Sequence, residues 1–175
     1  RKGDRPGACV RDARRRRPSA ALGRSRAWLL ANPDERILDC DATDRYEAFV
    51  TRRAQGEPVA YLLGEAWFAG LRFRVDPSVL IPRSPVAELI ATRCEPWIDG
   101  REPGRILDLC CGSGCIGIAA ALAWPDAEVV LSDISPAALA LARENVALRG
   151  VGERLRVVES DLFAALGGEV FDLIL

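Results

Sequence analysis

The sequence contains no histidine and no methionine, and its only lysine is Lys2. Without histidine, the protein lacks the usual general base at neutral pH and the commonest zinc ligand. No apolar run approaches the roughly 20 residues that a membrane-spanning helix needs, and no secretory signal precedes a cleavage site. We therefore expect a cytoplasmic protein with no membrane partner. Because methionine is absent, we also expect its natural start to lie outside the printed sequence.

Cysteine is present, but its spacing favours neither a disulfide framework nor a metal site. The six cysteines stand at positions 9, 40, 94, 110, 111 and 115. An even number could form disulfides, yet nothing else in the sequence indicates secretion. Cys110, Cys111 and Cys115 lack the paired C-x-x-C spacing of zinc sites. We expect no metal and interpret the three as small residues that fill a tight turn.

Positive charge is concentrated at the N-terminus. Residues 1–26 contain ten basic and two acidic residues, whereas the rest of the chain contains 14 basic and 23 acidic residues. The run Arg14–Arg17 could belong to a basic arm that contacts RNA. We favour the alternative, a disordered or non-native leader. Direct nucleic-acid binding is therefore expected only through this leader.

The residues after the leader predict short helices and then a β-hairpin. Helical patterns occupy residues 27–55 and are interrupted by a turn at Asn32-Pro33; Tyr46, Phe49 and Val50 share one face. Residues 61–77 are rich in strand formers and contain the turn Ala69-Gly70. Further on, we expect Ser84 to cap a helix whose first residue is Pro85, since proline is favoured at that position.

From Arg105 onward the pattern alternates between strands and helices. The expected strands are residues 105–109, 127–133, 155–160 and 171–175. This alternation predicts an α/β fold with a parallel sheet covered by helices. We divide the chain into a basic leader (1–26), a helical domain (27–65), a hairpin with a connecting helix (66–100) and an α/β domain that binds a cofactor (101–175).

The stretch ILDLCCGSGCIGIA, residues 106–119, contains a G-x-G-x-x-G motif at Gly112, Gly114 and Gly117. A strand that enters a glycine turn and then a helix offers backbone N–H groups to a nucleotide. Asp133, 19 residues after Gly114, stands at the end of the next strand, where a carboxylate can bind ribose hydroxyls. NAD enzymes and other adenosine-binding proteins share both features.

Two further acids distinguish between the cofactors. Asp108 precedes the loop, where its carboxylate would repel a diphosphate but suit a cationic amine such as that of S-adenosylmethionine. Asp161 follows the next strand, where it could hold an adenine amino group. An acid after each of three consecutive strands therefore favours S-adenosylmethionine over NAD, although NAD is not excluded.

Several stretches of the chain resemble one enzyme family. The sequences ILDLCCGSGCIGIA, LSDISPAALALARENVALRG and ESDLF resemble class I methyltransferases that modify glutamine at the amide nitrogen, the protein-(glutamine-N5) methyltransferases. The resemblance covers roughly residues 45–175, and VLIPR after a hairpin is a specific marker of the family. It implies a Rossmann-like class I methyltransferase sheet, present in part, preceded by a small helical domain for substrate recognition and a β-hairpin linker.

The resemblance also implies a binding site for S-adenosylmethionine. In it, Asp108 lies beneath the loop, Asp133 binds the ribose, Asp161 lies near the adenine, Leu162 lies beside the adenine, and the loop consists of Cys110, Cys111, Gly112, Ser113 and Gly114. The Asn-Pro-Pro-Tyr motif with which the family binds the substrate amide is expected beyond Leu175. We therefore name no catalytic residue and expect the 175-residue chain alone to be inactive.

The substrate implied by the resemblance is a translation protein. GEAWFAGL and IPRSPVAELI resemble the branch that modifies a large-subunit ribosomal protein, the third in its numbering. RAWLLANPDE and RRAQGEPVAYLLGE resemble the branch that modifies the Gly-Gly-Gln glutamine of peptide chain release factors. We favour the ribosomal protein. Two other functions stay open: an NAD-dependent oxidoreductase, and a non-enzymatic module that binds RNA or the ribosome through the leader.

Overall fold

The computed structural model describes residues 23–24, 26–31 and 40–175. Most of the basic leader and the predicted Asn32-Pro33 turn lie outside these residues. The chain divides into two compact units, residues 1–63 and residues 64–175, and the finer division into four parts stays a prediction. Among the described residues, no helix is long and apolar enough to cross a membrane.

The described part of the first unit is helical, as predicted. Its helices are α2 (Arg26–Ala31), α3 (Cys40–Ala54) and α4 (Val59–Leu63). On α3, Tyr46 and Phe49 are half-buried whereas Val50 is exposed, so the buried face is narrower than predicted. Helix α4 corrects the predicted start of the hairpin: residues 61–63 are helical, because Pro58 suits a first helical turn and its carbonyl accepts the Tyr61 N–H (3.1 Å).

The second unit begins with the predicted hairpin. Strands β1 (Glu65–Phe68) and β2 (Leu71–Arg74) pair antiparallel across the turn Ala69-Gly70. Both turn residues have positive φ, 49° and 74°, which is the backbone of a type I′ hairpin turn. Phe68 and Phe73 lie in the hydrophobic core of this unit. The sequence signals for strands and turn are therefore confirmed here.

Helix α5 (Val86–Ala91) follows an extended segment. It begins one residue later than predicted, so Pro85 precedes the helix instead of being its first residue. The Ser84 hydroxyl still accepts the N–H of Val86 (3.2 Å), as a capping side chain does. Pro85 has the φ and ψ angles of a helix, −65° and −11°. The predicted and observed helix starts therefore differ by only one residue, which is a common ambiguity at helix ends.

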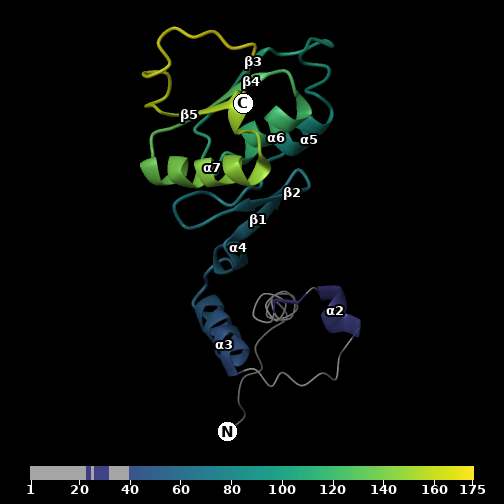
Figure 1. Cartoon of the computed structure of the whole chain (residues 1–175), viewed down its shortest axis with the longest axis vertical. Helices are drawn as coiled ribbons and strands as arrows, with labels where there is room; N and C mark the ends of the chain where they lie inside the picture. Colours follow the sequence, from purple (N-terminus) through teal and green to yellow (C-terminus); the bar gives the residue numbers. More distant parts are fainter. Residues whose placement is uncertain (1–22, 25, 32–39) are drawn as a thin grey trace. The chain divides into compact units, whose positions relative to one another are not determined.

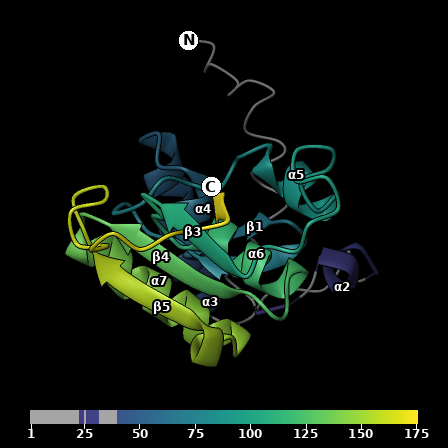
Figure 2. The same cartoon turned by 90° about the horizontal axis from the view of Figure 1, so that it is seen from above.

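A four-stranded parallel sheet in the order β5-β4-β3-β6 forms the centre of the second unit (Figures 1 and 2). Two helices and a 3-10 turn connect its strands. The elements are β3 (Arg105–Leu109), α6 (Cys115–Ala123), β4 (Glu128–Asp133), α7 (Pro136–Arg149), η1 (Gly152–Arg154), β5 (Leu155–Glu159) and β6 (Leu173–Ile174). The predicted alternation and parallel pairing are confirmed, and β4, β5 and β6 are shorter than predicted.

Successive side chains along each strand are buried on opposite faces of the sheet. Ile106, Val129 and Leu131 lie in the larger core cluster, together with residues of α6 and α7. Leu107 and Val130 point to the other face, where a smaller cluster contains Leu166 and Phe171. Both faces are covered, which explains why β3 and β4 read as nearly continuous apolar runs.

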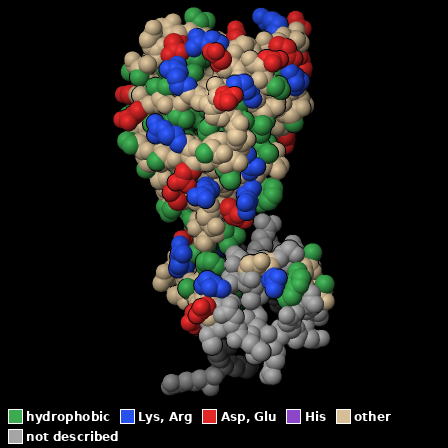
Figure 3. Space-filling view, viewed as in Figure 1, with side chains coloured by type: hydrophobic (Ala, Val, Ile, Leu, Met, Phe, Trp, Pro, Cys, Tyr) green, Lys and Arg blue, Asp and Glu red, His purple; other side chains and the backbone are tan. Residues whose placement is uncertain are grey.

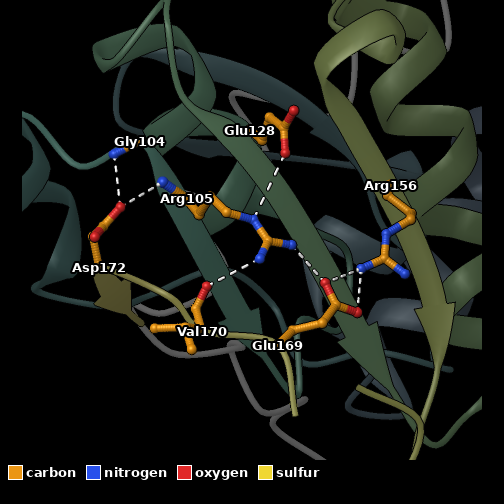
Figure 4. Close-up of polar contacts among 7 residues, drawn as sticks. All are labelled: Gly104, Arg105, Glu128, Arg156, Glu169, Val170 and Asp172. Atoms are coloured by element: carbon orange, nitrogen blue, oxygen red, sulfur yellow. Dashed lines mark hydrogen bonds and ion pairs between the residues drawn. The ribbon is translucent and has the colours of Figure 1, made fainter. Parts of the chain in front are cut away.

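An ion-pair network joins the amino ends of the strands to the segment after β5 (Figure 4). Glu169 lies between Arg105 and Arg156, with N–O distances of 2.6 Å to each guanidinium. Arg105 also approaches Glu128 at 3.7 Å. Asp172 accepts the backbone N–H groups of Gly104 (2.9 Å) and Arg105 (2.8 Å). These contacts hold β6 in register beside β3.

Charged side chains are mixed on the face of the second unit that Figure 3 shows. Arginines and acidic residues alternate over the surface, and neither sign forms a large continuous patch there. Proteins that bind nucleic acid through a folded surface gather basic residues on one face or stripe. This face of the second unit lacks that pattern.

Candidate cofactor site

The glycine loop connects the carboxyl end of β3 to α6. Cys110, Gly112 and Gly114 have φ angles of 59°, 53° and 73°, so the chain turns through left-handed conformations over a few residues. At Gly114, an added Cβ would lie 2.9 Å from Leu131 Cδ1. Glycine is therefore required both by the backbone and by the packing of the loop on β4.

Gly117 brings the first turn of α6 into close contact with β3. An added Cβ there would overlap Leu131 and lie 2.9 Å from Asp108 Cβ. This close approach lets the Gly117 N–H donate to Asp108 Oδ2 at 2.7 Å. The third glycine of the motif therefore serves helix–strand packing, as in nucleotide-binding folds.

Asp108 is the most deeply buried acid of the site, with 2% of its surface exposed. Burial raises the pKa of its carboxyl group to about 7. The hydrogen bond from the Gly117 N–H lowers this pKa in part, and the nearby charge of Asp133 raises it by a smaller amount. Near neutral pH the carboxyl group is therefore balanced between its neutral and ionised forms. A cation in its neighbourhood would favour the ionised form.

Asp133, at the end of β4, ties the loop to the next turn. Its Oδ2 accepts the Gly112 N–H and its Oδ1 accepts the Ser135 N–H, both at 2.9 Å. An ionised carboxylate has about four lone-pair sites, so each oxygen can accept a further hydrogen bond. The side chain is thus oriented by the backbone and still able to bind hydroxyl groups.

A pocket of about 420 Å³ lies between the glycine loop and the segment of residues 78–84. Its volume is within the range of small-molecule sites. Five residues predicted to bind the cofactor line it: Cys110, Cys111, Gly112, Ser113 and Asp133. Asp108 and Gly114 do not line it and support the loop from below. The structure therefore brings most of the predicted loop and one predicted acid to one cavity.

Asp161 and Leu162 lie apart from the lining of this pocket. Both are exposed, Leu162 by 53%. The Ser160 N–H donates to the Asp133 carbonyl at 3.0 Å, so the end of β5 lies beside the end of β4. The predicted roles of Asp161 and Leu162 near an adenine stay predictions.

The cysteines of the loop are free thiols in the structure. Burial raises the pKa of the Cys111 thiol far above its ordinary value and that of Cys115 to about 11. Neither is a thiolate at neutral pH, so neither is an activated nucleophile. Within the described ranges, no three His, Cys, Asp or Glu side chains form a group that could hold a metal ion.

Two features of the site were not predicted from the sequence. Residues 78–84, which include VLIPR, form the second wall of the pocket. Asn145 is fully buried in α7. A polar residue in the apolar stripe of a helix is an unfavourable choice, and that signal was present in the sequence.

Two family descriptions match the chain. Residues 95–175 match the family described as Methyltransferase small domain, and residues 18–64 match the family described as PrmC N-terminal domain. The first match covers the parallel sheet and the glycine loop, and confirms the predicted fold class.

Two relatives are both described as ribosomal protein uL3 glutamine methyltransferase. The one from Francisella tularensis is 50% identical over 119 residues, 67% of this chain and 38% of the relative. The one from Xanthomonas campestris pv. campestris is 48% identical over 154 residues, 88% of this chain and 46% of the relative. A solved SAM-dependent methyltransferase from Agrobacterium tumefaciens is 24% identical, with a TM-score of 0.49 over 63% of this chain and 37% of that chain. The chain thus spans less than half the length of the curated relatives described here.

Proposed function

The chain belongs to the protein-(glutamine-N5) methyltransferase family, and on that premise we propose that it binds S-adenosylmethionine for N5-methylation of a glutamine side chain in a ribosomal protein. The observation that carries this proposal is the glycine loop held over Asp108 and tied to Asp133 beside a pocket. The names of the two relatives, at close to 50% identity, support uL3 as the ribosomal protein.

Each part of the site has a role in holding the cofactor. The ribose hydroxyls would donate to Asp133, whose oxygens keep free lone pairs. The backbone of residues 110–114 would follow the nucleoside, and Asp161 with Leu162 would lie toward the adenine. Asp108 would favour the cationic amine at the methionine end. The cofactor supplies an electrophilic methyl group on a sulfonium.

The charge of Asp108 argues against NAD. A dinucleotide places its diphosphate over the glycine loop. Here Asp108 lies beneath the loop, and its carboxylate would repel a diphosphate. Asp133 does not distinguish the two cofactors, because NAD enzymes have an acid at the same strand end. A ligand with a cationic amine experiences the opposite interaction, because the Asp108 carboxylate attracts it.

The substrate nitrogen belongs to an amide and is a poor nucleophile, because its lone pair is delocalised. Transfer therefore depends on orientation of the amide and on electrostatic stabilisation more than on a general base. A chain without histidine is compatible with such chemistry. The Asn-Pro-Pro-Tyr motif expected after β6 would supply the groups that hold the amide.

Calorimetric titration of the chain with S-adenosylhomocysteine and, separately, with NAD tests the cofactor. We expect binding of the first and none of the second; the reverse result would favour an oxidoreductase. Methyl transfer is tested with the product of the gene read beyond codon 175, labelled S-adenosylmethionine, and either uL3 or a release factor. Labelling of the release factor instead of uL3 would contradict uL3 as the substrate but would support glutamine methylation as the reaction.

A further inference from the structure

Asn145 connects three segments that are distant in the sequence. Its Oδ1 accepts the Arg74 N–H at 2.7 Å, and its Nδ2 donates to the Arg74 carbonyl and to the Ser113 carbonyl, both at 3.0 Å. The side chain is fully buried in α7. One amide therefore links a helix, the last residue of the hairpin and the glycine loop.

The bonding pattern requires an amide at this position. A carboxamide has one acceptor oxygen and a nitrogen with two donors. Arg74 offers one donor and one acceptor, and Ser113 offers a second acceptor. Leucine or alanine would leave all three backbone groups without these partners, and aspartate would oppose a carboxylate to two carbonyl oxygens.

The two segments that Asn145 joins lead to the two walls of the pocket. Arg74 ends β2 and is followed by Val75, which is 2% exposed, and by the wall of residues 78–84. Ser113 belongs to the opposite wall. One buried side chain that itself does not line the pocket therefore bonds to the chain on both sides of it.

We propose that Asn145 is a positioning residue that sets the spacing of the two walls of the cofactor pocket and couples the hairpin to the glycine loop. This inference rests on the proposed function, because it takes the pocket to be the cofactor site. A pocket held at its bound spacing binds more tightly, since less ordering is needed on binding. By reciprocity, a bound cofactor stabilises the Asn145 contacts in turn.

The first test compares Asn145→Ala with Val146→Ala, its neighbour on the same helix. Val146 is also buried, but its Cγ1 lies 3.8 Å from the position that an added Cβ on Gly152 would take, and neither residue lines the pocket. We expect Asn145→Ala to weaken binding of S-adenosylhomocysteine by about tenfold or more, as losses of supporting hydrogen bonds around a site do. Val146→Ala should lower the thermal midpoint but leave the affinity within a factor of about two. Equal affinities for the two variants would overturn the proposal.

The second test uses the unmodified chain, so it can be carried out even if Asn145→Ala does not fold. Hydrogen exchange of the Arg74 amide reports its bond to Asn145, and that of the Val75 amide reports its bond to Gly64 within the hairpin. Saturation with S-adenosylhomocysteine should slow exchange at Arg74 more than at Val75. A purely structural asparagine predicts no difference between these two amides, and that result would overturn the inference.

A third measurement separates this inference from the proposed function. If the unmodified chain binds no S-adenosylhomocysteine, the proposed cofactor is wrong. The link between Asn145 and the loop is still tested without ligand, because the Gly114 amide donates to the Cys111 carbonyl within the loop. Its exchange should be faster in Asn145→Ala than in Val146→Ala, and equal rates would overturn the link itself.

Discussion

The two ends of the parallel sheet both gather acidic side chains, but the surroundings of the negative charge differ. At the amino ends, Glu169 lies between two guanidinium groups (Figure 4), and hydrogen bonds from Arg156 and then Arg105 hold its pKa below the ordinary value. At the carboxyl ends, Asp108 and Asp133 accept backbone N–H groups. In the part of the chain that the structure describes, neither has a cationic side chain as its partner.

The difference separates a structural charge from one available to a ligand. A carboxylate that is matched by arginines is satisfied within the protein and fixes one segment to another. A carboxyl group with a raised pKa beside a pocket has no internal counter-charge, and such groups concentrate at functional sites. At the carboxyl ends of the strands, a cationic ligand would provide a positive charge beside the carboxyl groups. At the amino ends, Arg105 and Arg156 already provide it.

Removing Asp133 is expected to have the largest effect. Asp133→Ala should weaken binding of S-adenosylhomocysteine by about 100-fold, because the ribose loses a charged acceptor and the Gly112 N–H loses its partner. Calorimetric titration measures the affinity. Glu169→Ala removes the same charge at the other end of the sheet and should leave affinity nearly unchanged. Similar losses in both variants would mean that net charge, not the site, determines binding.

Replacing Asp108 with asparagine should change affinity and stability in opposite directions. The folded-state pKa of Asp108 is raised to about 7 from 3.8, so its favourable contribution to stability is complete below the lower value and is lost as pH rises through the higher one. Asp108→Asn should therefore increase the free energy of unfolding by up to about 4 kcal/mol at pH 8, and by less at pH 5.

Affinity for S-adenosylhomocysteine should fall about tenfold in Asp108→Asn at pH 8, because the counter-charge for the amine is gone. Denaturant unfolding at the two pH values and titration at pH 8 measure both effects. A variant that binds as well as the unmodified chain would remove Asp108 from the proposed site.

The pH dependence of binding gives a smaller and more specific effect. Because the ionised form of Asp108 favours a cationic amine, affinity for S-adenosylhomocysteine should rise several-fold as pH increases through about 7. Methylthioadenosine, which lacks the amino-acid end, should show no such increase. Titrations at pH 6 and pH 8 compare the two ligands, and parallel pH profiles would contradict the assignment.

The smallest expected effect concerns the network at the amino ends. Glu169→Gln should slightly lower the thermal midpoint, because Arg105 and Arg156 lose their shared anion. The difference from the unmodified chain should shrink with added salt, since these side chains are accessible to solvent. Thermal unfolding at low and high ionic strength measures it. A salt-independent difference would indicate that packing of the segment, not charge, is responsible.

Much of the fold followed from short stretches of sequence. The turn at Ala69-Gly70, the glycine loop and the four strands were predicted because each depends on residues adjacent in the chain. The corrections at residues 61–63, at Pro85 and at the ends of β4, β5 and β6 fall at element boundaries. There the competing patterns differ by a single turn, and local packing decides between them.

The sequence by itself determined that a strand, a glycine loop and a helix would carry acids at successive strand ends. Only the tertiary structure decided that Asp108 would be buried under Gly117, that residues 78–84 would face the loop, and that Asn145 would bind a strand 71 residues away. The physical reason is that backbone preferences act between neighbours. Burial, pKa and long-range hydrogen bonds depend on which surfaces the folded chain brings together.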